Sequence, residues 1–249
     1  MSAATGRTLL GVWAHPDDEA YLSAGLMLEY AARGDRVVIV TATLGEHGTK
    51  DPARWPPRRL ATRRRGELYR SLATLGVHEC HLLGFEDGTC HNGDGTEAVA
   101  RHIIDIRPDV IVTFGPDGMT GHLDHCAVSR WTTDAWTATA SDAELWYTTV
   151  TPDFHQRWDH VNALVGFWYD HCVPPNTPQD ELCHSIKLSQ DHLDAKVAAL
   201  HAHWSQTAPL EALIGARAFR DWWSTETFRA AGATAEARRD NVLVEAIAR

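Results

Sequence analysis

The sequence has no apolar run near the roughly 20 residues that are needed to span a bilayer. Its first residues enter a strand-like run almost at once, without the apolar segment and cleavage site of a secretory signal. Cysteine is scarce as well, with five residues in 249, an odd number, and no CxxC pair. These absences argue against a membrane protein and against a disulfide framework, and they predict a cytoplasmic protein with reduced thiols.

Basic residues are also fewer than acidic ones. The chain carries 23 Lys and Arg against 33 Asp and Glu, a formal net charge of -10. Because sequence-independent binding to nucleic acid needs a basic surface, the composition predicts no nucleic-acid partner. The first strand-to-helix turn also lacks the glycines of a phosphate-binding loop, and its acids would repel a pyrophosphate, which leaves a nucleotide-binding protein with little support.

The rest of the composition is that of an ordinary globular protein, 44% hydrophobic and 22% charged, which can bury a core. Apolar runs typical of strands alternate with segments of helical spacing. The expected strands are residues 8–14, 36–44, 78–84, 109–115 and 143–150, and the expected helices between them are residues 19–34, 58–76, 95–108 and 124–138. This alternation predicts an α/β fold, a mostly parallel sheet with helices on both faces in a Rossmann-like arrangement.

Beyond residue 152 the pattern loosens. The expected elements there are a proline-rich irregular stretch at 167–183, a strand at 184–189, an amphipathic helix at 189–207 and a strand or helix at 237–247. No linker is visible. We therefore expect a single domain over residues 1–249, with a core of residues 1–151 and a smaller, irregular C-terminal lobe of residues 152–249.

Two motifs rich in histidine and acid follow expected strands. AHPDDE occupies residues 14–19, after the first strand, and GPDGMTGHLDH occupies residues 115–125, after the fourth. Ligands of open α/β sheets bind outside the carboxyl ends of the strands, so we expect the two motifs to meet there. Elsewhere, His201 and His203 cannot share a helix face, which favours solvated or packed histidines.

The adjacent acids of the first motif need a counter-charge, because ionised carboxylates repel one another. A divalent cation held by His15 and one of the two residues Asp17 and Asp18 would supply it, while the other aspartate faces a bound water. The alternative is a helix cap, in which proline opens the first turn and the acids face the helix dipole. The first motif alone favours neither.

The second motif supplies a partner. His122 and His125 are three residues apart, so at a helix start they share one face. Either histidine could complete a His/Asp/His metal site and leave the other to face the substrate. Two imidazoles and one carboxylate are suitable ligands for catalytic zinc and for ferrous iron. Metal-bound water is acidic, a carboxylate can take its proton, and an imidazolium can stabilise an oxyanion. Together the motifs predict metal-assisted hydrolysis of an amide or ester.

With both motifs in this order, the sequence resembles the LmbE-like, or PIG-L, family of zinc-dependent de-N-acetylases. The match runs from residue 9 to residue 127, with a weaker tail at residues 194–207. The resemblance implies a hydrolase that removes an N-acyl group, expected to be acetyl, from an N-acetylglucosamine-type conjugate, with Zn²⁺ as cofactor. It implies a small acylated amino sugar as partner. The lobe that shapes substrate choice in relatives matches poorly, so the substrate stays open, as does homo-oligomer formation.

The resemblance also implies roles for individual residues. The zinc ligands that it implies are His15, Asp18 and His125. Asp17 corresponds to the general base that takes a proton from the zinc-bound water. His122 resembles the histidine that stabilises the tetrahedral intermediate and can act as an acid. Asp124 resembles the acid that orients and charges that histidine.

Three further residues match substrate-binding positions of the family. Glu46 follows the second strand, Arg64 lies where relatives bind substrate oxygens, and Asp87 lies where relatives bind sugar hydroxyls. Two positions depart from the family pattern. Leu123 replaces a proline, which affects the stiffness of the loop, and Thr120 replaces a tyrosine that some relatives carry, so a phenol contact must come from elsewhere or be absent.

Two other functions stay open. One is a natural-product tailoring amidase or deacylase that performs the same chemistry on a non-sugar substrate. The other is a non-catalytic, sugar-binding relative. The presence of every expected ligand and of the expected base counts against this second alternative.

Overall fold

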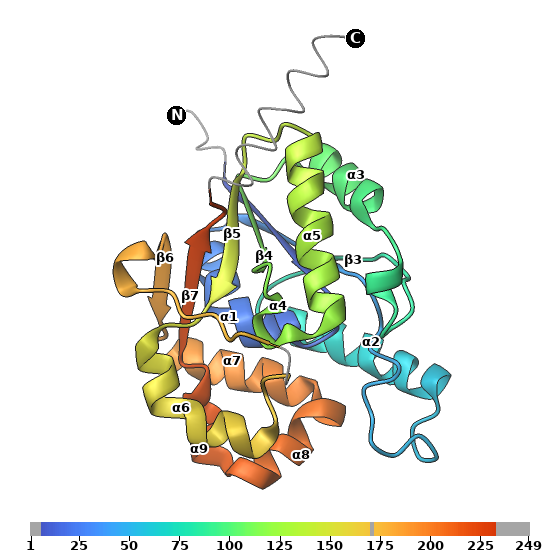
Figure 1. The fold of residues 1–249 in the computed structure, drawn as a ribbon, viewed down its shortest axis with the longest axis vertical. Coiled ribbons are helices and arrows are strands. Elements are labelled where there is room, and N and C mark those ends of the chain that lie inside the picture. Colours follow the sequence, from blue (N-terminus) through green and yellow to red (C-terminus); the bar gives the residue numbers. More distant parts are fainter. Residues whose placement is uncertain (1–5, 170–171, 233–249) are drawn as a thin grey trace.

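The computed structural model describes residues 6–169 and 172–232, and within them seven strands form one sheet in the order β3-β2-β1-β4-β5-β7-β6 (Figure 1). The strands are β1 (Thr8–Trp13), β2 (Arg36–Thr41), β3 (Glu79–Leu82), β4 (Val110–Phe114), β5 (Glu144–Thr149), β6 (His184–Lys187) and β7 (Thr225–Ala230). The strands from β1 to β5 pair in parallel. β7 runs antiparallel to both of its neighbours, β5 and β6. The expected mostly parallel α/β sheet is confirmed.

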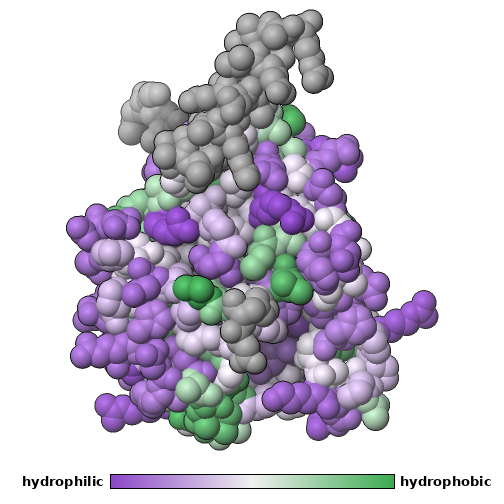
Figure 2. Space-filling model, in the orientation of Figure 1, coloured by the Kyte–Doolittle hydropathy of each residue, from purple (hydrophilic) through white to green (hydrophobic). Residues whose placement is uncertain are grey.

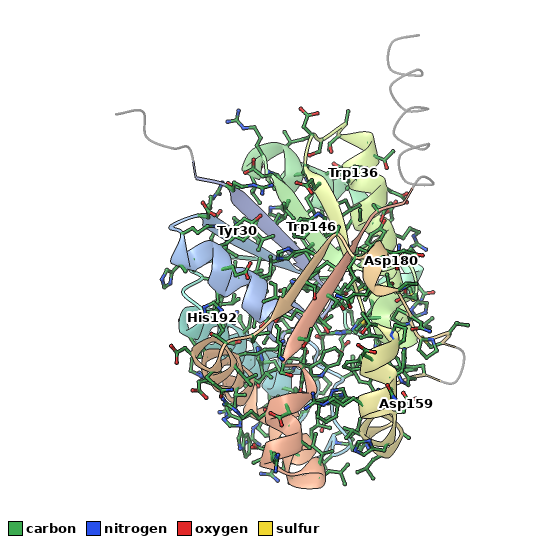
Figure 3. All side chains as sticks on the ribbon, turned by 90° about the vertical axis from the view of Figure 1, so that its left-hand side faces the viewer. Tyr30, Trp136, Trp146, Asp159, Asp180 and His192 are labelled. Atoms are coloured by element: carbon green, nitrogen blue, oxygen red, sulfur yellow. The ribbon has the colours of Figure 1, made fainter. Side chains whose placement is uncertain are left out.

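Helices cover both faces of this sheet. The α-helices of the described residues are α1 (Asp18–Ala32), α2 (Pro57–Thr74), α3 (Thr96–Ile106), α4 (Gly118–Gly121), α5 (Leu123–Ala138), α6 (Pro152–Val165), α7 (Gln190–Ala202), α8 (Trp204–Ile214) and α9 (Ala216–Trp222). Figure 3 shows Tyr30 of α1 and Trp136 of α5 on opposite sides of the sheet, with Trp146 of β5 between them. α3 packs on α5, and α1 and α2 pack on α7, which gives three layers.

The core lies where β1 and β4 run through the middle of the sheet. Both strands are apolar at nearly every position, because helices cover both of their faces. Trp13 of β1 meets Phe114 of β4 edge-on, with ring centroids 5.1 Å apart, and Trp131 of α5 is fully buried. Burying a large apolar side chain contributes about 1.5–3 kcal/mol, so this packing holds the ends of both strands in place.

The C-terminal part contains more regular structure than the sequence indicates. The loosened pattern did not predict α6, and the expected single helix at residues 189–207 is broken at His203 into α7 and α8. β7 was not predicted either. Its alternation of apolar and polar residues is obscured by Glu226, which is buried because it pairs with Lys196 at 2.7 Å.

In the described residues 167–169 and 172–183 the expected irregular stretch contains one short 3-10 turn, Gln179–Glu181. The ambiguous segment at residues 237–247 lies outside the described residues. α6, α8 and α9 lie below the carboxyl ends of the parallel strands in Figure 1. Figure 2 shows a mainly hydrophilic face, with its largest apolar area in the region of α6 and α9.

The structure also bears on cysteine chemistry and on membranes. All five cysteines are free, in agreement with the expected thiols. Among the described helices, none combines the length and the apolar character that crossing a bilayer requires.

Candidate metal centre

The two motifs meet at the carboxyl ends of β1 and β4, as the sequence predicts. Oδ1 of Asp18 lies 3.4 Å from Nε2 of His125, and Nδ1 of His15 lies 3.1 Å from the same nitrogen. Oδ2 of Asp18 is 3.6 Å from Nδ1 of His15. Tetrahedral coordination at about 2.0 Å places two ligand atoms about 3.3 Å apart, and these three contacts are close to that distance. Asp18 faces the two histidines through different oxygens, so a shared ion would be held by one of these oxygens together with the two rings.

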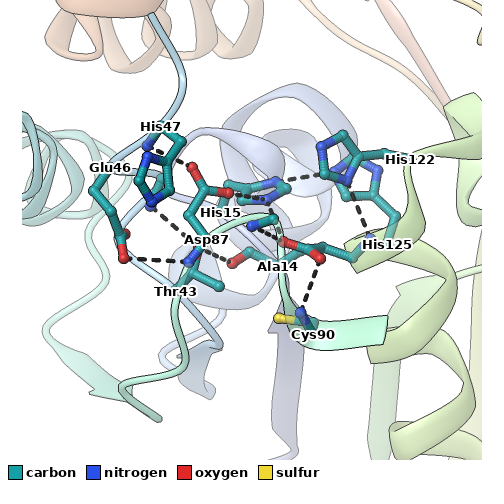
Figure 4. A network of polar contacts seen from close by, with 12 residues as sticks. Ala14, His15, Thr43, Glu46, His47, Asp87, Cys90, His122 and His125 are labelled. Carbon is teal, nitrogen blue, oxygen red and sulfur yellow. Dashed lines mark hydrogen bonds and ion pairs between the residues drawn. The ribbon is translucent and has the colours of Figure 1, made fainter. Parts of the chain in front are cut away.

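Hydrogen bonds fix which ring nitrogens face this point (Figure 4). Nδ1 of His125 donates to the carbonyl oxygen of Gly118 at 3.0 Å. Nε2 of His15 donates to the carboxylates of Asp87 at 3.1 Å and Asp124 at 3.4 Å. A neutral imidazole that is protonated on one nitrogen presents a lone pair on the other. Two lone pairs and a carboxylate therefore converge, an arrangement that requires a proton or a cation between them.

The charges around His15 favour such a cation. Burial alone would lower the pKa of His15, but the carboxylates of Asp124, Asp87 and Asp18 outweigh burial and raise that pKa to about 10. The same carboxylates place negative charge around the ring, which would also stabilise a divalent cation beside Nδ1 of His15. Carboxylates behind a ligating imidazole fix the orientation of its ring and raise its basicity, and Asp87 and Asp124 are placed to do this for His15.

Asp17 faces the pocket beside the metal-binding side chains. Its backbone has φ 118°, a left-handed conformation that costs a non-glycine residue about 1–3 kcal/mol. Among the described residues its side chain caps no backbone N–H of α1, which argues against the helix-cap interpretation. Its Oδ2 instead lies 3.0 Å from Nη2 of Arg64. Burial raises the pKa of Asp17 to about 6 although Arg64 lowers it, so this carboxylate can exchange a proton near neutral pH.

His122 is the residue that precedes α5. Its Nδ1 accepts the backbone N–H of Asp124 at 3.1 Å, so the hydrogen of the neutral ring is on Nε2. Burial and the neighbouring imidazoles of His125 and His15 lower the pKa of His122 to about 3. Near neutral pH the ring is therefore a neutral donor and not the imidazolium that the motif suggested. One ring nitrogen from each of the three histidines lies within 4.8 Å of the other two, so His122 is also within reach of an ion.

Asp124 is placed differently from its expected role. Its buried carboxylate accepts the backbone N–H of Gly88 at 2.7 Å and that of Cys90 at 3.0 Å, and it contacts His15. Its hydrogen bond to His122 is made by the backbone N–H. The start of α5 directs the carboxylate toward the loop after β3, so the carboxylate supports the ring of His15, whereas the ring of His122 is held by the backbone N–H of Asp124. The negative charge of Asp124 still acts on His122, since it opposes the lowering of the His122 pKa.

Of the three expected substrate-binding residues, Arg64 and Asp87 line the pocket, whereas Glu46 is not among the described residues that line it. Oε1 of Glu46 accepts the backbone N–H of Asp87 at 3.2 Å. Gly45, at φ 61°, turns the chain so that His47 lines the pocket instead. A Cβ at Gly45 would collide with the guanidinium of Arg64, whose Nη1 donates to the Gly45 carbonyl oxygen at 2.9 Å.

A pocket of about 520 Å³ lies over these residues. Its apolar wall comes mainly from the C-terminal lobe and includes Val165, Phe167, Tyr169, Leu210, Trp222 and Trp223. The backbone N–H of Tyr169 donates to Thr120 at 3.0 Å, and its ring meets the ring of His122 edge-on, with centroids 5.4 Å apart. Sequence reasoning missed these residues because they lie outside any motif. Two aromatic runs, residues 167–169 and residues 222–223, were the local signals for an aromatic wall.

Comparisons with known proteins agree with this geometry. The PIG-L family, described as GlcNAc-PI de-N-acetylase, matches residues 10–136. Two similar relatives are 1D-myo-inositol 2-acetamido-2-deoxy-alpha-D-glucopyranoside deacetylases. The one from Mycolicibacterium gilvum is 34% identical, with 80% of each chain covered. The one from Thermomonospora curvata is 31% identical, with 81% of each chain covered.

A solved structure supports the fold. N,N'-diacetylchitobiose deacetylase from Pyrococcus horikoshii, in complex with an inhibitor, superposes with a TM-score of 0.60 at 19% identity. The superposition covers 90% of this chain and 84% of that chain. The match over half of the sequence and the identity to the relatives confirm the resemblance drawn from the two motifs, and the chain belongs to the PIG-L family.

Proposed function

We propose that the protein is a metal-dependent hydrolase that removes the N-acetyl group from an N-acetylglucosamine-type conjugate. The observation that carries this proposal is the convergence of two imidazole lone pairs and the Asp18 carboxylate at one point, with Asp17 beside them in a pocket. The names of the relatives support it, since they describe deacetylation of an acetamido sugar joined to inositol. The neighbouring structure is a deacetylase of diacetylchitobiose.

In this proposal His15, Asp18 and His125 hold one divalent cation. Zn²⁺ suits two imidazoles and a carboxylate, and Fe²⁺ suits them as well. When bound, the cation supplies a Lewis acid that polarises the amide carbonyl and lowers the pKa of water. Asp87 and Asp124 keep the ring of His15 in the ligating tautomer.

Asp17 acts as the general base that takes the proton from the attacking water. Arg64 holds its carboxylate in place at 3.0 Å. As the water attacks, negative charge develops on the former carbonyl oxygen, and Nε2–H of His122 donates a hydrogen bond to it. Because His122 is neutral, the proton that the leaving amine needs comes from Asp17, which has just received one.

We assign substrate selection to the two walls of the pocket, one of which is polar and the other apolar. Asp87 and His47 supply polar groups for sugar hydroxyls on one side, and Phe167 and Trp222 supply an apolar surface on the other. Residues 1–249 act as one domain in this proposal, since the sheet runs through both halves of the chain. The cytoplasmic location and a homo-oligomer stay predictions.

A substrate panel tests the function. Zinc-loaded protein is incubated with N-acetylglucosaminyl-inositol, diacetylchitobiose, N-acetylglucosamine and a small non-sugar acetamide, and free amine is measured. We expect release from at least one of the acetylated sugars, abolished by a chelator. Hydrolysis of the non-sugar amide alone would favour the tailoring amidase. Stoichiometric metal without hydrolysis of any acylated amine would favour the non-catalytic relative.

A further inference from the structure

A second pair of ionisable side chains lies behind Asp17. Glu19 and His203 are both 0% exposed, and Oε1 of Glu19 lies 2.9 Å from Nε2 of His203. Glu19 belongs to the first turn of α1, whereas His203 comes from the C-terminal part of the chain. Neither residue has a role in the reaction proposed above.

The other oxygen of Glu19 connects this pair to the proposed base. Oε2 of Glu19 accepts the backbone N–H of Asp17 at 2.9 Å. With φ at 118°, the backbone of Asp17 directs its N–H toward Glu19 and its carboxylate toward Arg64 and the pocket. This conformation is unfavourable for an aspartate, so contacts around it must hold it.

The fold brings His203 to this place by ending a helix there. α7 ends and α8 begins at His203, whose carbonyl oxygen accepts the N–H groups of Gln206 and Thr207. The break places the ring beneath α1. Oγ of Ser71, on α2, donates to Oε1 of Glu19 at 3.5 Å, and Arg64 contributes positive charge nearby. The pair is thus enclosed by α1, α2 and the junction of α7 with α8.

We propose that Glu19 and His203 are positioning residues for Asp17. His203 fixes the carboxylate of Glu19, and Glu19 holds the backbone N–H of Asp17, so that the Asp17 carboxylate stays aimed into the pocket. The inference rests on the proposed role of Asp17 as the base. It connects the C-terminal lobe to the proton-transfer step through His203, which is fully buried and is not among the described residues that line the pocket.

Substitutions of His203 by side chains of different length and hydrogen-bonding capacity test the proposal. His203→Gln places a nitrogen donor near the position of Nε2, whereas His203→Asn is too short to reach Glu19, and His203→Leu has no donor. We expect kcat to fall about 10–100-fold in the Asn and Leu variants, because a misplaced catalytic group loses rate without losing substrate binding. KM and zinc content should stay near their wild-type values, and the Gln variant should recover most of kcat.

His201→Leu is the matched control, since His201 lies two residues earlier, in the last turn of α7, but is exposed and pairs with Glu211 at 3.0 Å. It should change neither kcat nor KM. A second readout needs no activity: in metal-free protein, the amide signal of Asp17 in a ¹H–¹⁵N spectrum should shift in the Asn variant and stay in place in the Gln and His201→Leu variants.

The outcomes separate the two proposals. If the Asn and Leu variants keep the wild-type kcat while only their melting temperature falls, the pair is merely structural and the positioning role is overturned. Equal losses in the Gln and Asn variants would overturn it too. Wild-type protein without any hydrolytic activity would instead overturn the proposed function, and the Asp17 amide signal would still test the contact.

Discussion

Oδ1 of Asp18 lies 3.4 Å from Nε2 of His125, although the two residues belong to separate motifs. They meet because β1 and β4 are neighbours in the sheet, paired in parallel from Leu9 and Val110 onward. Alone, the first motif also fits a helix cap and the second fits surface histidines. Their convergence beneath one pocket is what makes a metal centre the better interpretation of both.

Asp17→Asn should lower kcat by about 10²–10⁴-fold, the usual contribution of a general base, because the amide has a similar shape but cannot accept the proton. Zinc content should be unchanged, since Asp17 is not a proposed ligand. Steady-state kinetics and metal analysis measure the two effects. Asp105→Asn, at an exposed position on α3, is the control. Normal turnover in Asp17→Asn would reject the role of the base.

His125→Ala should abolish stoichiometric zinc binding, because it removes one of two imidazole ligands. His81→Ala, which removes a partly exposed histidine at the edge of the sheet, should leave zinc binding intact. Metal analysis after dialysis measures both variants. Full zinc occupancy in His125→Ala would show that His125 is not a ligand.

Asp87→Asn should weaken metal binding about 10–100-fold, since Asp87 accepts the hydrogen of the His15 ring at 3.1 Å. Competition with a chromogenic chelator measures the affinity. If Asp87 served only to bind sugar hydroxyls, the variant would raise KM and leave the metal affinity as it is in the wild type. That result would contradict the support that Asp87 gives to His15.

The parallel core was predictable because strands that are buried on both faces are continuous apolar runs, and both motifs follow such runs. The lobe was less predictable. β7 was not predictable because Glu226, buried in an ion pair, interrupts the alternation of apolar and polar residues. The helix break at His203 was not predictable because no proline or glycine lies at that position. Tyr169 reaches His122 only through the tertiary fold, which no local pattern records.

Within the site, too, the sequence predicted some features and not others. The spacing of the motifs predicted which side chains meet, but not which way each ring faces. The neutral state of His122 depends on burial and on two neighbouring imidazoles. The direction of the Asp124 carboxylate depends on backbone N–H groups of Gly88 and Cys90, in a loop far away in the sequence.

Lys196→Met should destabilise the fold by about 3–5 kcal/mol, because it leaves the carboxylate of Glu226 buried without its counter-charge. That carboxylate also accepts the N–H groups of Gly25 and Leu26, so it cannot move into water without disturbing α1. Urea denaturation measures the loss. Lys187→Met, at an exposed position on β6, is the control, and an equal effect of both variants would contradict the assignment.

His203 should make stability depend on pH. Burial lowers the pKa of His203, but the charge of Glu19 outweighs it and raises the pKa above its ordinary value of 6.5. A raised folded-state pKa means that the bound proton stabilises the fold fully below about pH 6.5, and that this contribution is lost as the pH rises through the folded-state pKa.

The unfolding free energy of metal-free wild type, compared with that of His203→Gln, measures this contribution. The advantage of the wild type should be largest at acid pH and should shrink as the pH rises. An advantage that stays constant or grows with pH would contradict the ionised pair of Glu19 and His203.

The position of the ion in crystals of the zinc-loaded protein, located by anomalous scattering at the zinc edge, tests the metal centre most directly. We expect one peak within about 2.0–2.2 Å of Nδ1 of His15, one oxygen of Asp18 and Nε2 of His125. A peak against other side chains, such as Asp87 and Asp124, or no peak at all, would contradict the shared site on which the hydrolase depends.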